Sequence, residues 1–121
     1  MKIDGLRQIA GDFGGMLIDQ FGVIHDGEKL YPGTLQVLEQ LHALDIPVVV
    51  MTNSGKRAEA NRRRLVRMGV PRDHFVDAVS SGEVAFSGLT AKRAFLIGKD
   101  GEDYGFDGID FVSDPRDAEI I

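Results

Sequence analysis

The sequence of 121 residues contains no cysteine and no tryptophan, and it has only four prolines. Without cysteine, the protein can form no disulfide, no thiolate metal site and no cysteine nucleophile. It also has no apolar run long enough to cross a bilayer and no hydrophobic signal-peptide region at its N-terminus. We therefore expect a cytoplasmic protein with no membrane partner.

Positive charge is scarce in one part of the chain. The formal net charge is −5, and residues 99–121 hold 8 of the 19 acidic side chains but only 2 of the 14 basic ones. The rest of the chain is close to neutral, which does not suit a nucleic-acid partner. The densest basic stretch contains Arg62, Arg63, Arg64 and Arg67, but on a helix these side chains fan around the axis. We interpret them as a solvated face.

The composition is that of an ordinary globular domain with a core, since 43% of residues are hydrophobic and 27% are charged. Two apolar runs, within residues 16–22 and 48–54, each stop on polar groups, and an amphipathic segment separates them. This segment is predicted to be a helix with Thr34 as its N-cap. A strand–helix–strand unit predicts an α/β fold with a parallel sheet. The buried stripe of the helix is expected to comprise Leu35, Leu38, Leu41 and Leu44.

The same patterns assign the rest of the chain. Residues 1–12 are predicted to form a short helix or lead-in, and residues 22–33 a turn-rich segment with an Asp-Gly hairpin signal. The last four residues resemble the opening of a strand, so we expect the sequence to be a fragment of a longer protein. The two apolar runs belong to strands expected at 13–19 and 46–51. Further strands are expected at 75–79, 94–98 and 109–112, and further helices at 56–68 and 83–89.

Polar residues at the ends of the first two strands are candidates for chemistry. Ligands bind beyond the carboxyl ends of parallel strands, where we expect Asp19 and Thr52 to lie side by side. The Asp19 carboxylate could attack phosphorus or hold Mg²⁺. The Thr52 hydroxyl and the main-chain N–H groups near Asn53 could hold phosphate oxygens beside the N-terminus of the next helix. Alternatively, Asp19 caps its strand, and Thr52, Asn53 and Ser54 form an ordinary helix N-cap.

Other polar residues carry weaker signals. His25, in the turn-rich segment, could touch a substrate but is expected to be a solvent-exposed loop histidine. His42 is expected on the polar side of a helix and His74 in a loop, neither with a partner cluster. The acidic run 100–105 hints at a Ca²⁺ loop, but Tyr104 occupies a ligand position, so we interpret the run as surface.

A family resemblance rests on several of these segments together. Residues 17–27 resemble motif I of the haloacid dehalogenase (HAD) superfamily, and residues 31–54, with the leucine stripe, resemble the segment that leads to motif II in its subclass IIA. Residues 75–85 resemble the lead into the large cap of that subclass. The resemblance covers roughly residues 12–98. It implies a partial Rossmann-like core at 1–90 and the truncated start of an α/β cap domain at 91–121.

The resemblance also implies a function, which is Mg²⁺-dependent hydrolysis of a phosphomonoester. Asp19 matches the nucleophile of the family, which forms an aspartyl phosphate, and Thr52 matches its phosphate-binding hydroxyl. Asn53 matches the residue that lends a main-chain N–H to phosphate. The metal ligands would be Asp19 and the main-chain carbonyl of Phe21. The expected partner is a small phosphorylated metabolite, such as a sugar phosphate, a nucleotide or a cofactor phosphate.

Two departures from the family pattern leave alternatives open. Phe21 occupies the place of the usual Asp that protonates the leaving group, and the Lys and acidic residues of the later motifs do not occur. One alternative is therefore a catalytically impaired phosphate-binding or interaction module. A receiver-like domain is a third hypothesis, which fits less well because the second strand ends in Thr52-Asn53 and offers no acceptor Asp. A partial core would also expose apolar strand edges, so a homo-oligomer is possible.

Overall fold

The computed structural model describes residues 2–121, so Met1, the first residue of the predicted lead-in, lies outside the described residues. The lead-in consists of two short 3₁₀ turns, η1 (Leu6–Gln8) and η2 (Ala10–Asp12). None of the helices in the described part of the chain is both long and apolar enough to span a membrane.

The main sheet has three parallel strands in the order β1 (Met16–Asp19), β2 (Val48–Thr52) and β3 (Asp77–Ser80). The prediction of an α/β fold with a parallel sheet is therefore confirmed. β1 begins three residues later than expected, because the first ladder bond runs from the Met16 N–H to the Pro47 carbonyl at 2.8 Å. Proline has no N–H to continue the ladder in the other direction.

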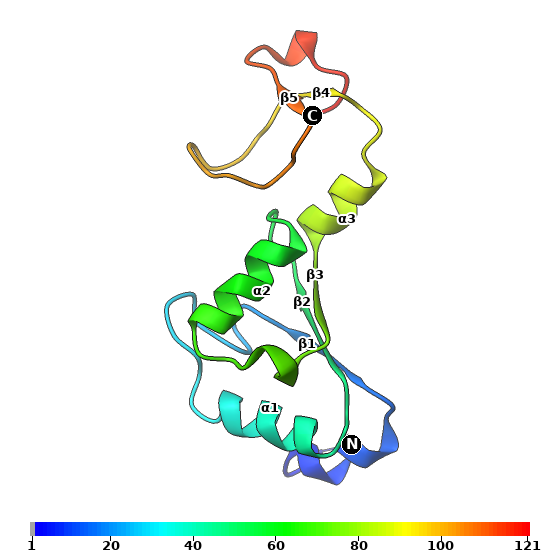
Figure 1. Ribbon diagram of the computed structural model, residues 1–121, viewed down its shortest axis with the longest axis vertical. Coiled ribbons are helices and arrows are strands. Elements are labelled where there is room, and N and C mark those ends of the chain that lie inside the picture. The colour runs from blue at the N-terminus through cyan, green and yellow to red at the C-terminus, as the bar shows by residue number, and fades with distance from the viewer. Residues whose placement is uncertain (1) are drawn as a thin grey trace.

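Two helices cover one face of this sheet, as Figure 1 shows. They are α1 (Thr34–Ala43), between β1 and β2, and α2 (Ala58–Arg67), between β2 and β3. Alternate strand residues face these helices, and ten buried side chains form the core beneath them. The core residues are Ala10, Ile24, Leu38, Leu41, Val48, Val50, Leu65, Val70, Phe75 and Ala78.

The leucine stripe of α1 is shorter than predicted. Leu38 and Leu41 are each 2% exposed, whereas Leu35 is 40% exposed and Leu44 is 62% exposed. Steps of three residues fall short of a full helical turn by about 60°, so four leucines at this spacing cannot all face one core.

The predicted N-cap of α1 is also wrong. Gly33 occupies the cap position with φ of 88°, which suits glycine, and Thr34 is the first helical residue. The Thr34 hydroxyl donates to the Ile24 carbonyl instead, at 3.2 Å. It therefore ties the start of α1 to the preceding loop.

The C-terminal part begins with α3 (Ser81–Gly88) and a small parallel sheet of β4 (Arg93–Ala94) and β5 (Asp110–Phe111). The strands predicted at 94–98 and 109–112 are reduced to two residues each, because the chain between them turns away to contact the start of α2 (Figure 1). There the Arg57 N–H donates to the Tyr104 carbonyl at 3.3 Å. The expected division at residues 90 and 91 stays a prediction.

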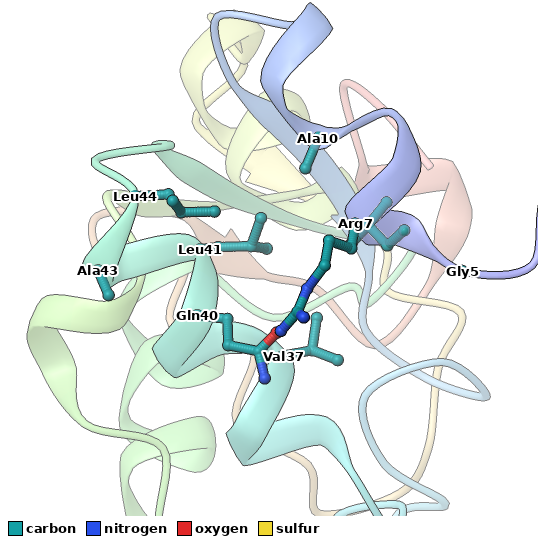
Figure 2. A pocket seen from close by; sticks show the side chains of 9 residues that line it. Gly5, Arg7, Ala10, Val37, Gln40, Leu41, Ala43 and Leu44 are labelled. Atoms are coloured by element: carbon teal, nitrogen blue, oxygen red, sulfur yellow. The ribbon is translucent and has the colours of Figure 1, made fainter.

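A hollow of ≈ 590 Å³ lies between the lead-in and α1, and Figure 2 shows its lining. Arg7 donates to the Gln40 side-chain oxygen across it at 3.2 Å. Its other lining side chains are apolar, among them Val37, Leu41 and Leu44, and none is acidic. It offers no nucleophile, so the candidate site lies elsewhere.

Candidate active site

The predicted site residues meet at the carboxyl edge of the main sheet. Asp19 is the last residue of β1, Thr52 is the last residue of β2, and Asn53 follows directly. All three line one hollow of ≈ 750 Å³, which Ser80 and Ser81 close on the β3 side. The strand register pairs Asp19 with Met51, so Thr52 extends one residue beyond it. A carboxylate and a hydroxyl thus border the same space.

The Asp19 carboxylate is exposed and held by a single hydrogen bond. Its Oδ1 accepts from the Gln20 N–H at 2.8 Å, and that N–H also donates to the Met51 carbonyl at 2.9 Å. Within residues 2–121, no hydrogen bond reaches Oδ2. One carboxylate oxygen is therefore oriented by the backbone while the other is left open to the hollow.

Two side-chain hydroxyls of the loop after β2 accept hydrogen bonds from main-chain N–H groups of the same loop. The Thr52 Oγ1 accepts from the Ser54 N–H, and the Ser54 Oγ accepts from the Lys56 N–H, both at 3.2 Å. The N–H groups of Asn53 and Gly55 make no hydrogen bond in the described part of the chain. Free N–H groups beside a hydroxyl are suitable partners for an anion.

The expectation that this loop lies at the N-terminus of the next helix is wrong. The helix predicted from residue 56 begins at Ala58, five residues after Asn53, and the Ala58 N–H donates to Glu83 Oε2 at 2.9 Å. Glu83 also accepts from Arg57 Nε at 2.8 Å and from Nη2 at 2.9 Å. The Arg57 hydrogen bonds, with that of the Ala58 N–H, lower the pKa of Glu83 to about 2. The N-terminus of α2, which is the positive end of the helix dipole, therefore binds the Glu83 carboxylate.

The start of α3 holds the loop after β2 in place, and sequence reasoning missed this contact. The Ser80 hydroxyl donates to the Lys56 carbonyl at 2.6 Å, and the Gly82 N–H donates to the Ser54 carbonyl at 3.0 Å. The Ser80 Oγ also accepts from the Glu83 N–H at 3.1 Å and caps α3. The Ser-x-x-Glu pattern at 80–83 is a capping-box signal that would have placed the helix start correctly.

His25 is 1% exposed, so the prediction of a solvent-exposed loop histidine is wrong. Its Nδ1 accepts from the Gly27 N–H at 3.0 Å, which assigns the proton of the neutral ring to Nε2. The Arg64 side chain donates a hydrogen bond to the Gly27 carbonyl at 2.6 Å and so connects this turn to α2. Burial, followed by the charge of Arg64, lowers the pKa of His25. The hairpin expected at Asp26-Gly27 is confirmed, because the Asp26 N–H donates to the Lys29 carbonyl at 3.1 Å.

Phe21 stands two residues after Asp19, and its side chain is 62% exposed. The ring meets His25 edge to face, with centroids 6.0 Å apart. Its carbonyl accepts no hydrogen bond among residues 2–121. The Phe21 carbonyl and the Asp19 carboxylate are thus oxygen donors on one short segment, a set that fits a hard cation such as Mg²⁺.

The remaining polar residues divide into two groups. Two arginines of α2 pair with carboxylates, since Arg62 bonds Glu59 and Asp77, and Arg63 bonds Glu59. The expectation that His42 and His74 lack a partner cluster is wrong, because their rings stack at 4.8 Å beside Asp73. That cluster lies away from the carboxyl edge.

Comparisons with known proteins agree with this fold. A family model described as haloacid dehalogenase-like hydrolase matches residues 16–112. No curated protein matches the chain significantly. Among solved structures, a haloacid dehalogenase-like family hydrolase from Brucella suis 1330 is 24% identical with a TM-score of 0.78. The match covers 93% of this chain and 43% of that one.

A hypothetical protein from Pyrococcus horikoshii OT3 is also similar, with 25% identity and a TM-score of 0.52. The match covers 74% of this chain and 36% of that protein. The chain therefore spans less than half the length of either structure.

Proposed function

The chain belongs to the haloacid dehalogenase-like hydrolases, and from that premise we propose that it supplies the nucleophile and the phosphate-binding loop of a Mg²⁺-dependent phosphomonoesterase. The observation that carries the proposal is the convergence of Asp19, Thr52 and Asn53 on one hollow at the carboxyl edge. The substrate would be a small phosphomonoester, such as a sugar phosphate, a nucleotide or a cofactor phosphate.

In the proposed reaction, the open Oδ2 of Asp19 attacks phosphorus, and the bond from phosphorus to the ester oxygen breaks. The leaving oxygen takes a proton from solvent. Water then attacks the aspartyl phosphate, which releases inorganic phosphate and restores the carboxylate. The Thr52 hydroxyl and the Asn53 N–H would hold the phosphate oxygens through both steps, because donors fixed before the reaction stabilise the charge that develops.

The proposed metal ligands are Asp19 and the Phe21 carbonyl. When bound, Mg²⁺ would neutralise charge on the phosphate and reduce its repulsion from the carboxylate. The Gln20 N–H orients Asp19 Oδ1, so we propose that Oδ1 would bind the cation while Oδ2 attacks phosphorus.

The test is Asp19→Asn in the full-length protein, assayed with p-nitrophenyl phosphate and Mg²⁺. We expect hydrolysis to fall by about 10³-fold or more, as for the loss of other nucleophiles. Asp12→Asn, another exposed carboxylate, is the matched control and should keep the wild-type rate. Equal activity of Asp19→Asn and wild type would exclude Asp19 as the nucleophile.

Phe21 favours a second candidate function, a phosphate-binding module that does not turn over substrate. A phenyl ring can neither protonate a leaving group nor activate water, and general acid–base help is worth about 10²–10⁴-fold in rate. Calorimetric binding of inorganic phosphate by a protein that hydrolyses no phosphomonoester would support this second function. Hydrolysis that depends on Asp19 would exclude it.

A further inference from the structure

A second cluster of metal-ligating side chains lies at the opposite edge of the main sheet, where the strands begin. His42 comes from the last turn of α1, and Asp73 and His74 come from η3 (Arg72–His74), which precedes β3. The ligand atoms of the three side chains all lie within 4.8 Å of one another. This is the only such group of three or more among residues 2–121.

The Asp73 carboxylate lies beside the two stacked imidazoles. Its Oδ2 is 4.0 Å from His42 Nε2, and its Oδ1 is 4.0 Å from His74 Nε2. The two rings stack with centroids 4.8 Å apart and planes inclined by 26°. Each carboxylate oxygen thus lies 4.0 Å from one ring nitrogen, and the three side chains lie together on one patch of surface.

The surroundings favour a cation. The cluster borders a hollow of ≈ 180 Å³ whose lining includes the Asp45 carboxylate and no lysine or arginine. The nearby Arg72 instead lies over the Phe75 ring, 4.8 Å from its centroid, and donates to the Phe75 carbonyl.

Both imidazoles keep their ring nitrogens available as ligands. No side-chain hydrogen bond of His42 or His74 occurs in the part of the chain that the structure describes, and the buried Nδ1 of His74 has no partner. The protein therefore does not prescribe which nitrogen of His74 carries the proton. The side chains of His42 and Asp73 are 48% and 71% exposed, so an ion can reach them from solvent.

From this geometry we propose that His42, Asp73 and His74 form a zinc site that joins α1 to η3. Two imidazoles, one carboxylate and an open fourth position form a recurrent ligand set for Zn²⁺. Ligands around tetrahedral zinc stand about 3.3 Å apart, given bonds of about 2 Å. The exposed side chains therefore need to close by about 1.5 Å or less. Water or the Asp45 carboxylate would complete the coordination.

The test is titration of the full-length protein with Zn²⁺ by isothermal calorimetry and by thermal unfolding. We expect about one ion per chain and a rise in Tm on zinc addition, because an ion that binds the native state stabilises it. His42→Gln and Asp73→Asn, at exposed positions, should each weaken zinc binding by about tenfold or more and abolish the Tm rise.

Asp117→Asn is the matched control, because it removes an exposed carboxylate from the C-terminal part of the chain and should leave zinc binding unchanged. Absence of zinc binding in the wild type would overturn the proposal, as would equal binding by wild type and His42→Gln. Loss of zinc binding in Asp19→Asn alone would place the ion at the carboxyl edge and would also overturn it.

Discussion

Two residues that stand two positions apart, Asp19 and Phe21, dominate the chemistry proposed for this chain. The Asp19 carboxylate borders the hollow, and its Oδ2 accepts no hydrogen bond among residues 2–121, whereas Phe21 presents an exposed ring that cannot donate a proton to the leaving group of the proposed reaction. His25 does not replace the missing acid, because it is buried and its pKa is lowered. Under the proposed function, we therefore expect phosphomonoesters whose leaving group needs no proton to react faster than alkyl phosphates.

Phe21→Asp should restore the missing proton donor. Since general acid catalysis contributes about 10²–10⁴-fold, we expect kcat for an alkyl phosphate to rise by about tenfold or more, and kcat for p-nitrophenyl phosphate to change less. The measurement is kcat on both substrates, with Phe21→Leu as a control that removes the ring without adding an acid. A similar change in the two variants would show that the effect comes from loss of the ring.

At the scale of elements, the loop after β2, which we propose binds phosphate, depends on α3. The Ser80 hydroxyl donates to the Lys56 carbonyl. The Gly82 N–H donates to the Ser54 carbonyl of the same loop. Glu83 then binds Arg57 and the first N–H of α2. These contacts hold Asn53 and Gly55 with their N–H groups free. The geometry of the loop is thus determined by a helix that follows it by more than twenty residues in sequence.

Gly82→Ala should disturb this packing. An added Cβ would lie 1.9 Å from the Gly55 carbonyl oxygen and 2.8 Å from that of Lys56, so the backbone must move. Overpacking of this kind costs about 1–3 kcal/mol of unfolding free energy, measured by urea denaturation. Gly88→Ala in the same helix has no atom within 4 Å of the added Cβ and should be close to neutral. Equal effects of the two substitutions would contradict the packing argument.

At the scale of the whole molecule, the main sheet is covered on one face only. Leu17 is 71% exposed, Met51 44% and Val79 42%, and all three lie on the face opposite α1 and α2. An apolar sheet face and unpaired strand edges favour association. This exposure agrees with the homo-oligomer expected from the sequence, which stays a prediction.

Residues 1–121 as an isolated polypeptide should therefore associate with increasing concentration, as measured by sedimentation velocity. Leu17→Lys should weaken association by roughly tenfold or more, because burying a leucine is worth about 1.5–3 kcal/mol. Ile97→Lys, at a residue that is 79% exposed outside the main sheet, is the matched control. A monomer that unfolds cooperatively at all concentrations would contradict this prediction.

The sequence by itself determined the parallel α/β order and the edge at which Asp19, Thr52 and Asn53 meet. Both depend on local patterns, namely apolar runs that end on polar groups and a helix between them. Only the tertiary structure decided that His25 is buried and that Glu83 occupies the start of α2. It also decided that His42 meets Asp73 and His74. These features depend on contacts between residues distant in sequence, and a local pattern contains no information about which surfaces the fold brings together.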